Sequence, residues 1–406
     1  MGLLYDLSTK YKTLSIVGMA KNAGKTTALN YLIEEAIDEG ILLGVTSTGR
    51  DGESQDLVTG TEKPRVYLDQ DMLVAVPSLL YDLADAGLEV IKRTKYSTAI
   101  GELLICRVRE AGYVQIAGPV INAEQKMLCD DMINLGCQLI LIDGAIDRKS
   151  IASPDTSDAI ILSTGAVLSR KMNKVVEETA HIVNLYRTPQ LEEGVIRDAI
   201  ENNNFDDKIM LVNGKGEVKK LDLITGLGAA KEINGSIDED TRYIYIPGAF
   251  TNSVISDISL KNLKQVQFIL KDPTKIFVNV MDWGVFRKKG FRASVLENIE
   301  IAAITVNPWA PAGYTFDNRV LLAEMQKAIP DIPIIDVKMC IRDRFTSQYN
   351  FFMTSSSMAK VCSGAGKEPS LTSLMYSAKP SFITFPPSAK CFTNFGLKSE
   401  NNASMS

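Results

Sequence analysis

Residues 14–27, which read LSIVGMAKNAGKTT, decide the fold of the N-terminal part of the chain. The short apolar run Leu14–Val17 predicts a buried strand, because a loop of small residues follows it at once. A helical pattern begins at about Thr27 and continues through Ile33. The loop between the two presents its backbone N–H groups at the positive end of that helix, where anions bind. The stretch therefore predicts an anion site built from the backbone.

The loop ends in the Gly-Lys-Thr sequence that is typical of the phosphate-binding loop of P-loop NTPases. Gly24 lets the backbone approach a phosphate, Lys25 is expected to reach the outer phosphates, and the Thr26 hydroxyl is expected to bind Mg²⁺. The predicted nucleotide-binding residues are Gly18, Asn22, Ala23, Gly24, Lys25, Thr26 and Thr27. The motif usually has four residues between its first glycine and Gly-Lys, whereas five separate Gly18 from Gly24. Either Met19 takes the first glycine's place, or the loop is one residue longer; the alternative is an ordinary glycine turn.

A second polar loop, residues 47–56, follows the predicted strand 41–46. Ligands gather at the carboxyl ends of the strands in a doubly wound sheet, so this loop is expected to face the phosphate site. Its candidate Mg²⁺ or water ligands are Asp51, Glu53 and Asp56, and Arg50 is a candidate phosphate partner. A solvated charged turn is the alternative interpretation.

A third signal is the apolar run 138–142, which ends at Asp143. A strand that is buried on both faces and ends in an acid is a common way to hold Mg²⁺ opposite a phosphate loop. Asp147 and Arg148 in the next loop are second choices. We therefore predict Lys25, Asp51 and Asp143 as catalytic residues, Thr26, Asp51 and Asp143 as metal ligands, and ATP with Mg²⁺ as cofactors.

The order of strands and helices predicts an α/β protein with a doubly wound parallel sheet like that of the P-loop NTPases. We expect a nucleotide-binding domain over 1–190 and a second α/β domain over 206–338. Residues 339–406 differ in composition, with 13 serines but only 3 of the 49 acidic residues of the chain. This last part resembles translated adapter sequence and is interpreted as an artefact of assembly; a natural disordered tail is the alternative.

The bulk composition excludes several classes of function. The net charge of −5 argues against a dedicated nucleic-acid binder. No apolar run is long enough to span a membrane, and we expect a cytoplasmic protein. The single histidine, His181, leaves little room for a histidine-based triad or metal site. Scattered cysteines such as Cys106, Cys129 and Cys137 indicate free thiols in a reducing compartment.

The motifs together resemble one family, the small subunit of the lysine 5,6-aminomutase reactivase. The segments that carry the resemblance are residues 17–27, 48–53, 115–119, 142–149, 163–170 and 303–308. The resemblance implies that ATP is used to release damaged cobalamin from the adenosylcobalamin-dependent aminomutase. It also implies a partner subunit that is similar to the MutS ATPases, and it places phosphates and Mg²⁺ at Gly24, Lys25 and Thr26.

Two other functions remain open on the sequence alone. The loop is also similar to those of molybdopterin-guanine dinucleotide and dethiobiotin synthesis proteins, which would make the chain a small-molecule enzyme. The third interpretation, ranked last, is a nonhydrolysing regulatory subunit that binds nucleotide and acts through its partner. A complete Mg²⁺ site around Thr26, Asp51 and Asp143 would favour hydrolysis or synthesis, and a blocked loop would favour regulation.

Overall fold

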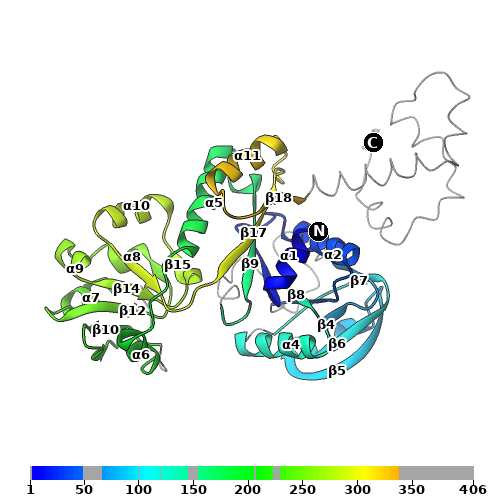
Figure 1. Cartoon of the computed structure of the whole chain (residues 1–406), viewed down its shortest axis with the longest axis horizontal. Helices are drawn as coiled ribbons and strands as arrows, with labels where there is room; N and C mark the ends of the chain where they lie inside the picture. The colour runs from blue at the N-terminus through cyan, green and yellow to red at the C-terminus, as the bar shows by residue number, and fades with distance from the viewer. Residues whose placement is uncertain are drawn as a thin grey trace, which may run out of the picture.

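The computed structural model describes residues 2–48, 66–98, 100–119, 121–144, 154–204, 207–222 and 229–337 (Figure 1). The predicted site residues Arg50, Asp51, Glu53, Asp56, Asp147 and Arg148 lie outside these residues, as does the tail 339–406.

A nine-stranded sheet forms the centre of the larger unit. Its strands in spatial order are β18 (Ile334–Asp336), β17 (Glu300–Asn307), β9 (Ala159–Gly165), β1 (Thr13–Gly18), β8 (Leu139–Asp143), β2 (Leu43–Ser47), β4 (Leu73–Pro77), β6 (Gly101–Glu110) and β5 (Gly87–Thr98). The strands from β18 to β4 run parallel, whereas β6 is antiparallel to both β4 and β5. The parallel strands are nearly continuous apolar runs because both of their faces are covered.

Helices cover both faces of this sheet. The helices α1 (Leu3–Lys10) and α2 (Lys25–Glu39) pack on one face, and α4 (Asn122–Asn134), α5 (Met172–Tyr186) and α11 (Asn318–Ala328) pack on the other. Strand β1 shows the alternation, because Leu14 and Ile16 join the core under α2 while Val17 joins the core under α5. The chain is thus an α/β protein with a large, mostly parallel central sheet, as predicted.

A five-stranded sheet forms the second unit, to the left in Figure 1. Its strands in spatial order are β11 (Val218–Lys220), β10 (Met210–Asn213), β12 (Thr241–Ile246), β14 (Gln267–Leu270) and β16 (Ala293–Val295). Its helices are α6 (Val195–Glu201), α7 (Ala230–Ser236), α8 (Asn252–Ile255), α9 (Leu260–Gln265) and α10 (Val280–Lys288). Phe250, Phe268 and Phe291 meet in its core, with ring centroids 5.2–5.8 Å apart.

Several short elements complete the fold. They are β3 (Val66–Leu68) with β7 (Gly112–Val114), β13 (Phe250–Thr251) with β15 (Ile276–Phe277), α3 (Ser78–Tyr81), and the 3₁₀ turns at Ala166–Leu168 and Pro273–Lys275. The pair of β3 and β7 lies outside the large sheet. The helical segment between β13 and β14 is divided into α8 and α9.

The strand pairing divides the chain differently from the predicted ranges 1–190 and 206–338. Strands β17 and β18 belong to the nine-stranded sheet, where β17 pairs with β9 from Glu300 to Asn307. The second unit is therefore inserted between α5 and β17. Both sheets are built from alternating apolar strands and helices, so the pattern alone does not assign a strand to one sheet or the other.

One buried hydroxyl pair joins α5 to the large sheet and gives a prediction about stability. Thr164 Oγ1 lies 2.8 Å from Thr179 Oγ1, both side chains are fully buried, and Thr179 also donates to the carbonyl oxygen of Val175. Thr179→Val should cost about 1–3 kcal/mol, because it leaves the Thr164 donor buried without a partner. Thr164→Val should cost less, because Thr179 keeps its bond to Val175. Urea unfolding followed by circular dichroism measures both, and equal losses would contradict this assignment of donors.

Candidate phosphate-binding site

The candidate site lies at the carboxyl ends of β1 and its two neighbours. Strand β1 pairs in parallel with β8 on one side and β9 on the other. From β1 the chain continues through α2 to β2, beyond β8, whereas from β9 it continues through α5 and the second unit to β17 on the other side, so these connections diverge at β1. Such a divergence at the carboxyl edge is where α/β sheets bind ligands.

The loop between β1 and α2 has the backbone of an anion cradle. Asn22 and Gly24 have positive φ angles of 64° and 105°. Gly24 is the N-cap of α2, and no side chain caps the helix there. The first-turn N–H groups of α2 thus point out of the helix beside Gly24. A phosphate is the kind of group that binds such a helix start.

Lys25 reaches across β1 to the end of β8. A Cβ on Gly18 would lie 3.0 Å from Lys25 Cγ, so the missing side chain makes room for the lysine stem. Lys25 Nζ donates a hydrogen bond to the carbonyl oxygen of Gly144. Gly18 therefore contributes to the site by accommodating Lys25, in addition to its place in the predicted loop.

Asp143 ends β8 directly opposite Ile16 of β1. Its carbonyl oxygen accepts hydrogen bonds from Thr48 N (3.2 Å) and Ser47 Oγ (3.1 Å). Its carboxylate oxygen Oδ1 is buried and accepts no hydrogen bond from the described residues. Burial raises the pKa of Asp143, and the nearby Lys25 ammonium opposes that shift. A buried carboxylate oxygen without a protein donor is a suitable ligand for a hard cation, so the chemistry present fits Mg²⁺.

The structure brings most of the predicted site residues to one edge of the sheet. They are Gly18, Asn22, Ala23, Gly24, Lys25, Thr26, Thr27 and Asp143. Among the described ranges, no group of three or more acidic, histidine or cysteine side chains is arranged to hold a metal ion. The sequence analysis missed Asn307, which follows an apolar strand and precedes a proline and whose side chain contacts the phosphate loop. The sequence does not predict this contact, because Asn307 lies 285 residues from Asn22 along the chain.

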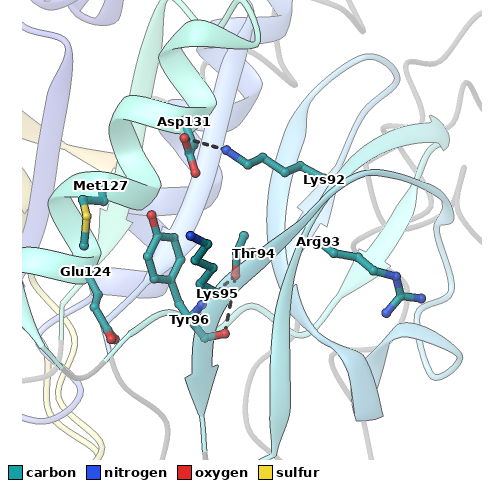
Figure 2. A pocket seen from close by; sticks show the side chains of 8 residues that line it. All are labelled: Lys92, Arg93, Thr94, Lys95, Tyr96, Glu124, Met127 and Asp131. Atoms are coloured by element: carbon teal, nitrogen blue, oxygen red, sulfur yellow. Dashed lines mark hydrogen bonds and ion pairs between the residues drawn. The ribbon is translucent and has the colours of Figure 1, made fainter.

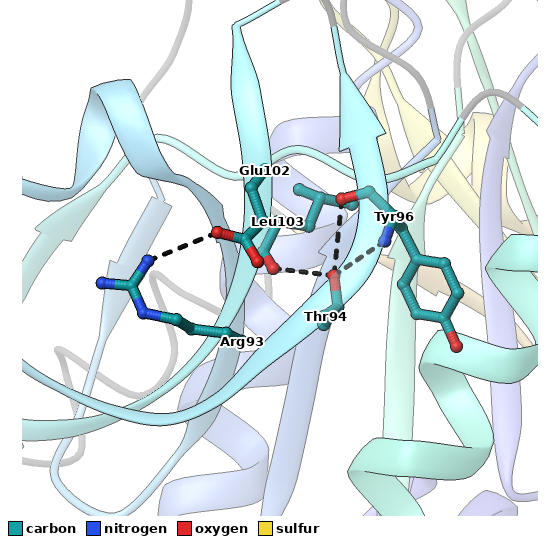
Figure 3. Close-up of polar contacts among 5 residues, drawn as sticks. All are labelled: Arg93, Thr94, Tyr96, Glu102 and Leu103. Carbon is teal, nitrogen blue, oxygen red and sulfur yellow. Dashed lines mark hydrogen bonds and ion pairs between the residues drawn. The ribbon is translucent and has the colours of Figure 1, made fainter.

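A second hollow lies between β5 and α4 (Figure 2) and carries three basic residues. Lys92 is paired with Asp131 at 2.8 Å, and Arg93 is paired with Glu102 at 3.3 Å (Figures 2 and 3). Thr94 donates to the carbonyl oxygen of Leu103, which fixes the hairpin below the hollow (Figure 3). Because two of its three cations are already neutralised, this hollow is a weaker anion site than the phosphate loop.

The thiols and the histidine are structural. Burial raises the pKa of Cys106, Cys129 and Cys137 to about 12, so these thiols stay protonated and weakly nucleophilic. His181 is buried, with Nε2 2.8 Å from the carbonyl oxygen of Val278. His181 therefore packs between α5 and the segment that ends at Val278.

A comparison of the chain with family models, curated proteins and solved structures finds no match. Within the described part of the chain, the helices are too short or too polar to cross a bilayer.

Replacing Asp143 separates ligand binding from stability. Burial raises the pKa of the Asp143 carboxyl in the folded protein. The folded state therefore loses stability relative to the unfolded state as the pH rises from the unfolded-state pKa of this carboxyl to its higher folded-state pKa. Asp143→Asn is always neutral, so the nucleotide-free variant should melt at no lower temperature than the wild type at pH 7.5. The same variant should lose about tenfold or more of the affinity for ATP that Mg²⁺ confers.

Asp158→Asn is the matched control for that experiment. Asp158 lies at the opposite edge of the sheet, where it accepts hydrogen bonds from Lys12 N (2.7 Å) and Thr13 N (2.9 Å). This variant should lower the melting temperature and leave the effect of Mg²⁺ unchanged. A destabilised Asp143→Asn protein that keeps its Mg²⁺ dependence would show that Asp143 is structural. Differential scanning calorimetry and titration calorimetry make the two measurements.

Proposed function

We propose that this chain binds ATP with Mg²⁺ at the carboxyl edge of β1 and β8. The observation that carries the proposal is the convergence of three features. These are the start of α2 at Gly24 without a side-chain cap, the Lys25 stem over Gly18, and a buried carboxylate oxygen of Asp143 that accepts no hydrogen bond from the described residues. Together they offer backbone donors and a cation to an anion, and an oxygen ligand to its metal.

Each residue has a distinct task in the proposed site. The backbone N–H groups around Gly24 bind phosphate oxygens, and Lys25 neutralises charge on the outer phosphates. Thr26 and Asp143 hold Mg²⁺, which would neutralise phosphate charge when bound. Burial of Asp143 keeps bulk water away from its carboxylate and strengthens its interaction with a cation.

We further propose that the chain is the ATP-binding subunit of a reactivase for adenosylcobalamin-dependent lysine 5,6-aminomutase. The support is the resemblance of the six quoted segments to the small subunit of that reactivase. In this proposal a partner subunit similar to the MutS ATPases binds the chain, and ATP binding drives release of damaged cobalamin from the aminomutase. The proposal leaves the main hydrolysis to the partner, so this chain acts as a cytoplasmic ATP-dependent chaperone component.

Lys25→Ala tests the binding proposal. Removing the ammonium should weaken ATP binding by about 10- to 100-fold, as expected for the loss of a charge-assisted contact. Lys95→Ala is the control, because Lys95 is an exposed lysine of the hollow in Figure 2. Titration calorimetry on the full chain distinguishes the two sites. Loss of ATP affinity in Lys95→Ala with full affinity in Lys25→Ala would move the nucleotide to the β5–α4 hollow.

A reactivation assay tests the wider proposal. Inactivated lysine 5,6-aminomutase is incubated with this chain, the MutS-like partner, ATP and fresh adenosylcobalamin, and aminomutase turnover is measured. Recovery should need both proteins and should fail with Lys25→Ala. No recovery, with ATP still bound to the isolated chain, would exclude the reactivase and favour a small-molecule enzyme on the same site.

A further inference from the structure

Asn307, the last residue of β17, reaches the phosphate loop from two strands away. Strand β9 lies between β17 and β1, and it ends in Gly165. A Cβ on Gly165 would lie 2.1 Å from the carbonyl oxygen of Asn307 and 3.0 Å from its Cβ. Asn307 is paired with Gly165 in the parallel register of β17 and β9, and only a glycine leaves space for so close an approach of the two backbones.

The Asn307 side chain contacts the loop at two points. Its Nδ2 lies 3.4 Å from the carbonyl oxygen of Asn22, to which it donates, and a Cβ on Gly24 would lie 3.2 Å from its Cβ. Its Oδ1 accepts a hydrogen bond from Trp309 N at 3.2 Å. This second bond fixes the orientation of the amide, because only an oxygen can accept it, and so directs the NH₂ group at the loop. The residue is buried, with 7% of its surface exposed.

The contact with Asn22 bears on how the loop binds an anion. The peptide that joins Asn22 to Ala23 donates its N–H group to the carbonyl oxygen of Ala20 at 3.2 Å, and its own carbonyl oxygen accepts from Asn307. Asn22 adopts a φ of 64°, a conformation uncommon for a residue with a side chain. A donor on its carbonyl oxygen stabilises this conformation and holds the carbonyl away from the bound group.

We propose that Asn307 is a positioning residue for phosphate binding, which acts by holding the Asn22 carbonyl and closing against Gly24. This inference rests on the proposed function, since it concerns the same site. Asn307 should therefore strengthen binding of the phosphates of the ligand and leave binding of its base unchanged. A merely structural residue would lower stability without distinguishing one part of the ligand from another.

Three ligands separate these possibilities by titration calorimetry on the full chain: ATP, pyrophosphate with Mg²⁺, and adenosine. Asn307→Ala should lower the affinities for ATP and for pyrophosphate by the same factor, about five- to tenfold, as expected for one lost orienting contact. Binding of adenosine should stay at the wild-type level. Asn298→Ala, two residues before the start of the same strand, is the matched control and should change none of the three.

Gly165→Ala provides an independent test, since its added methyl group displaces Asn307 without changing it. It should reproduce the phosphate-specific loss. If Asn307→Ala does not fold, Asn307→Ser removes the same donor with a smaller change in polarity and takes its place.

The outcomes separate the inference from the proposed function. Equal pyrophosphate affinity in wild type and Asn307→Ala, with Lys25→Ala impaired, overturns the inference alone. A loss of affinity for ATP and adenosine, with the affinity for pyrophosphate unchanged, also overturns the inference, since the amide would then contact the base. No binding of ATP or pyrophosphate to the wild type overturns the proposed function, and the inference with it.

Discussion

The parallel pairing of β1 with β8 on one side and β9 on the other is the constraint on which the structure depends. The register sets Ile16 of β1 opposite both Asp143 of β8 and Ile161 of β9. A strand in this position is buried on both faces, which requires α2 on one side and α5 on the other. The parallel pairing also brings the carboxyl ends of all three strands to the same edge of the sheet. The anion cradle, Lys25 and Asp143 are therefore brought together by backbone pairing, before any side chain of the site contacts another.

The sequence predicted the local part of this arrangement well, because the signals for it are local. The glycine loop before Lys25 and the run that ends at Asp143 specify their strands over a few residues. The hairpin from β10 to β11 follows from a turn of glycine and asparagine. Gly136, with a φ of 107°, follows the C-cap of α4, where a glycine commonly ends a helix.

The sequence could not predict which distant strands pair with one another. The run 301–306 is apolar throughout, as expected for a strand with both faces covered, and such a strand fits either sheet equally well. Its place beside β9 is set by packing against α5 and α11, which the pattern does not encode. Asn307 was missed for the same reason, since its hydrogen bond to Asn22 spans 285 residues. Gly165 carries the matching signal, but a glycine after a strand usually indicates only a turn.

The insertion of the second unit between α5 and β17 explains why the contact between Asn307 and Asn22 spans so much of the chain. The chain leaves the large sheet after α5, builds the five-stranded sheet, and returns through β16 to β17, whose last residue contacts the phosphate loop. Lys271, just after β14, also pairs with Asp155 of the segment that leads into β9, at 3.1 Å. Two connections thus join the second unit to strands that border the candidate site. A rigid shift of the second unit would act on the amino ends of β9 and β17 together, whereas Asn307 lies at the carboxyl end of β17, beside Gly165 of β9. Any effect of such a shift on the phosphate loop would therefore have to travel along the length of these two buried strands.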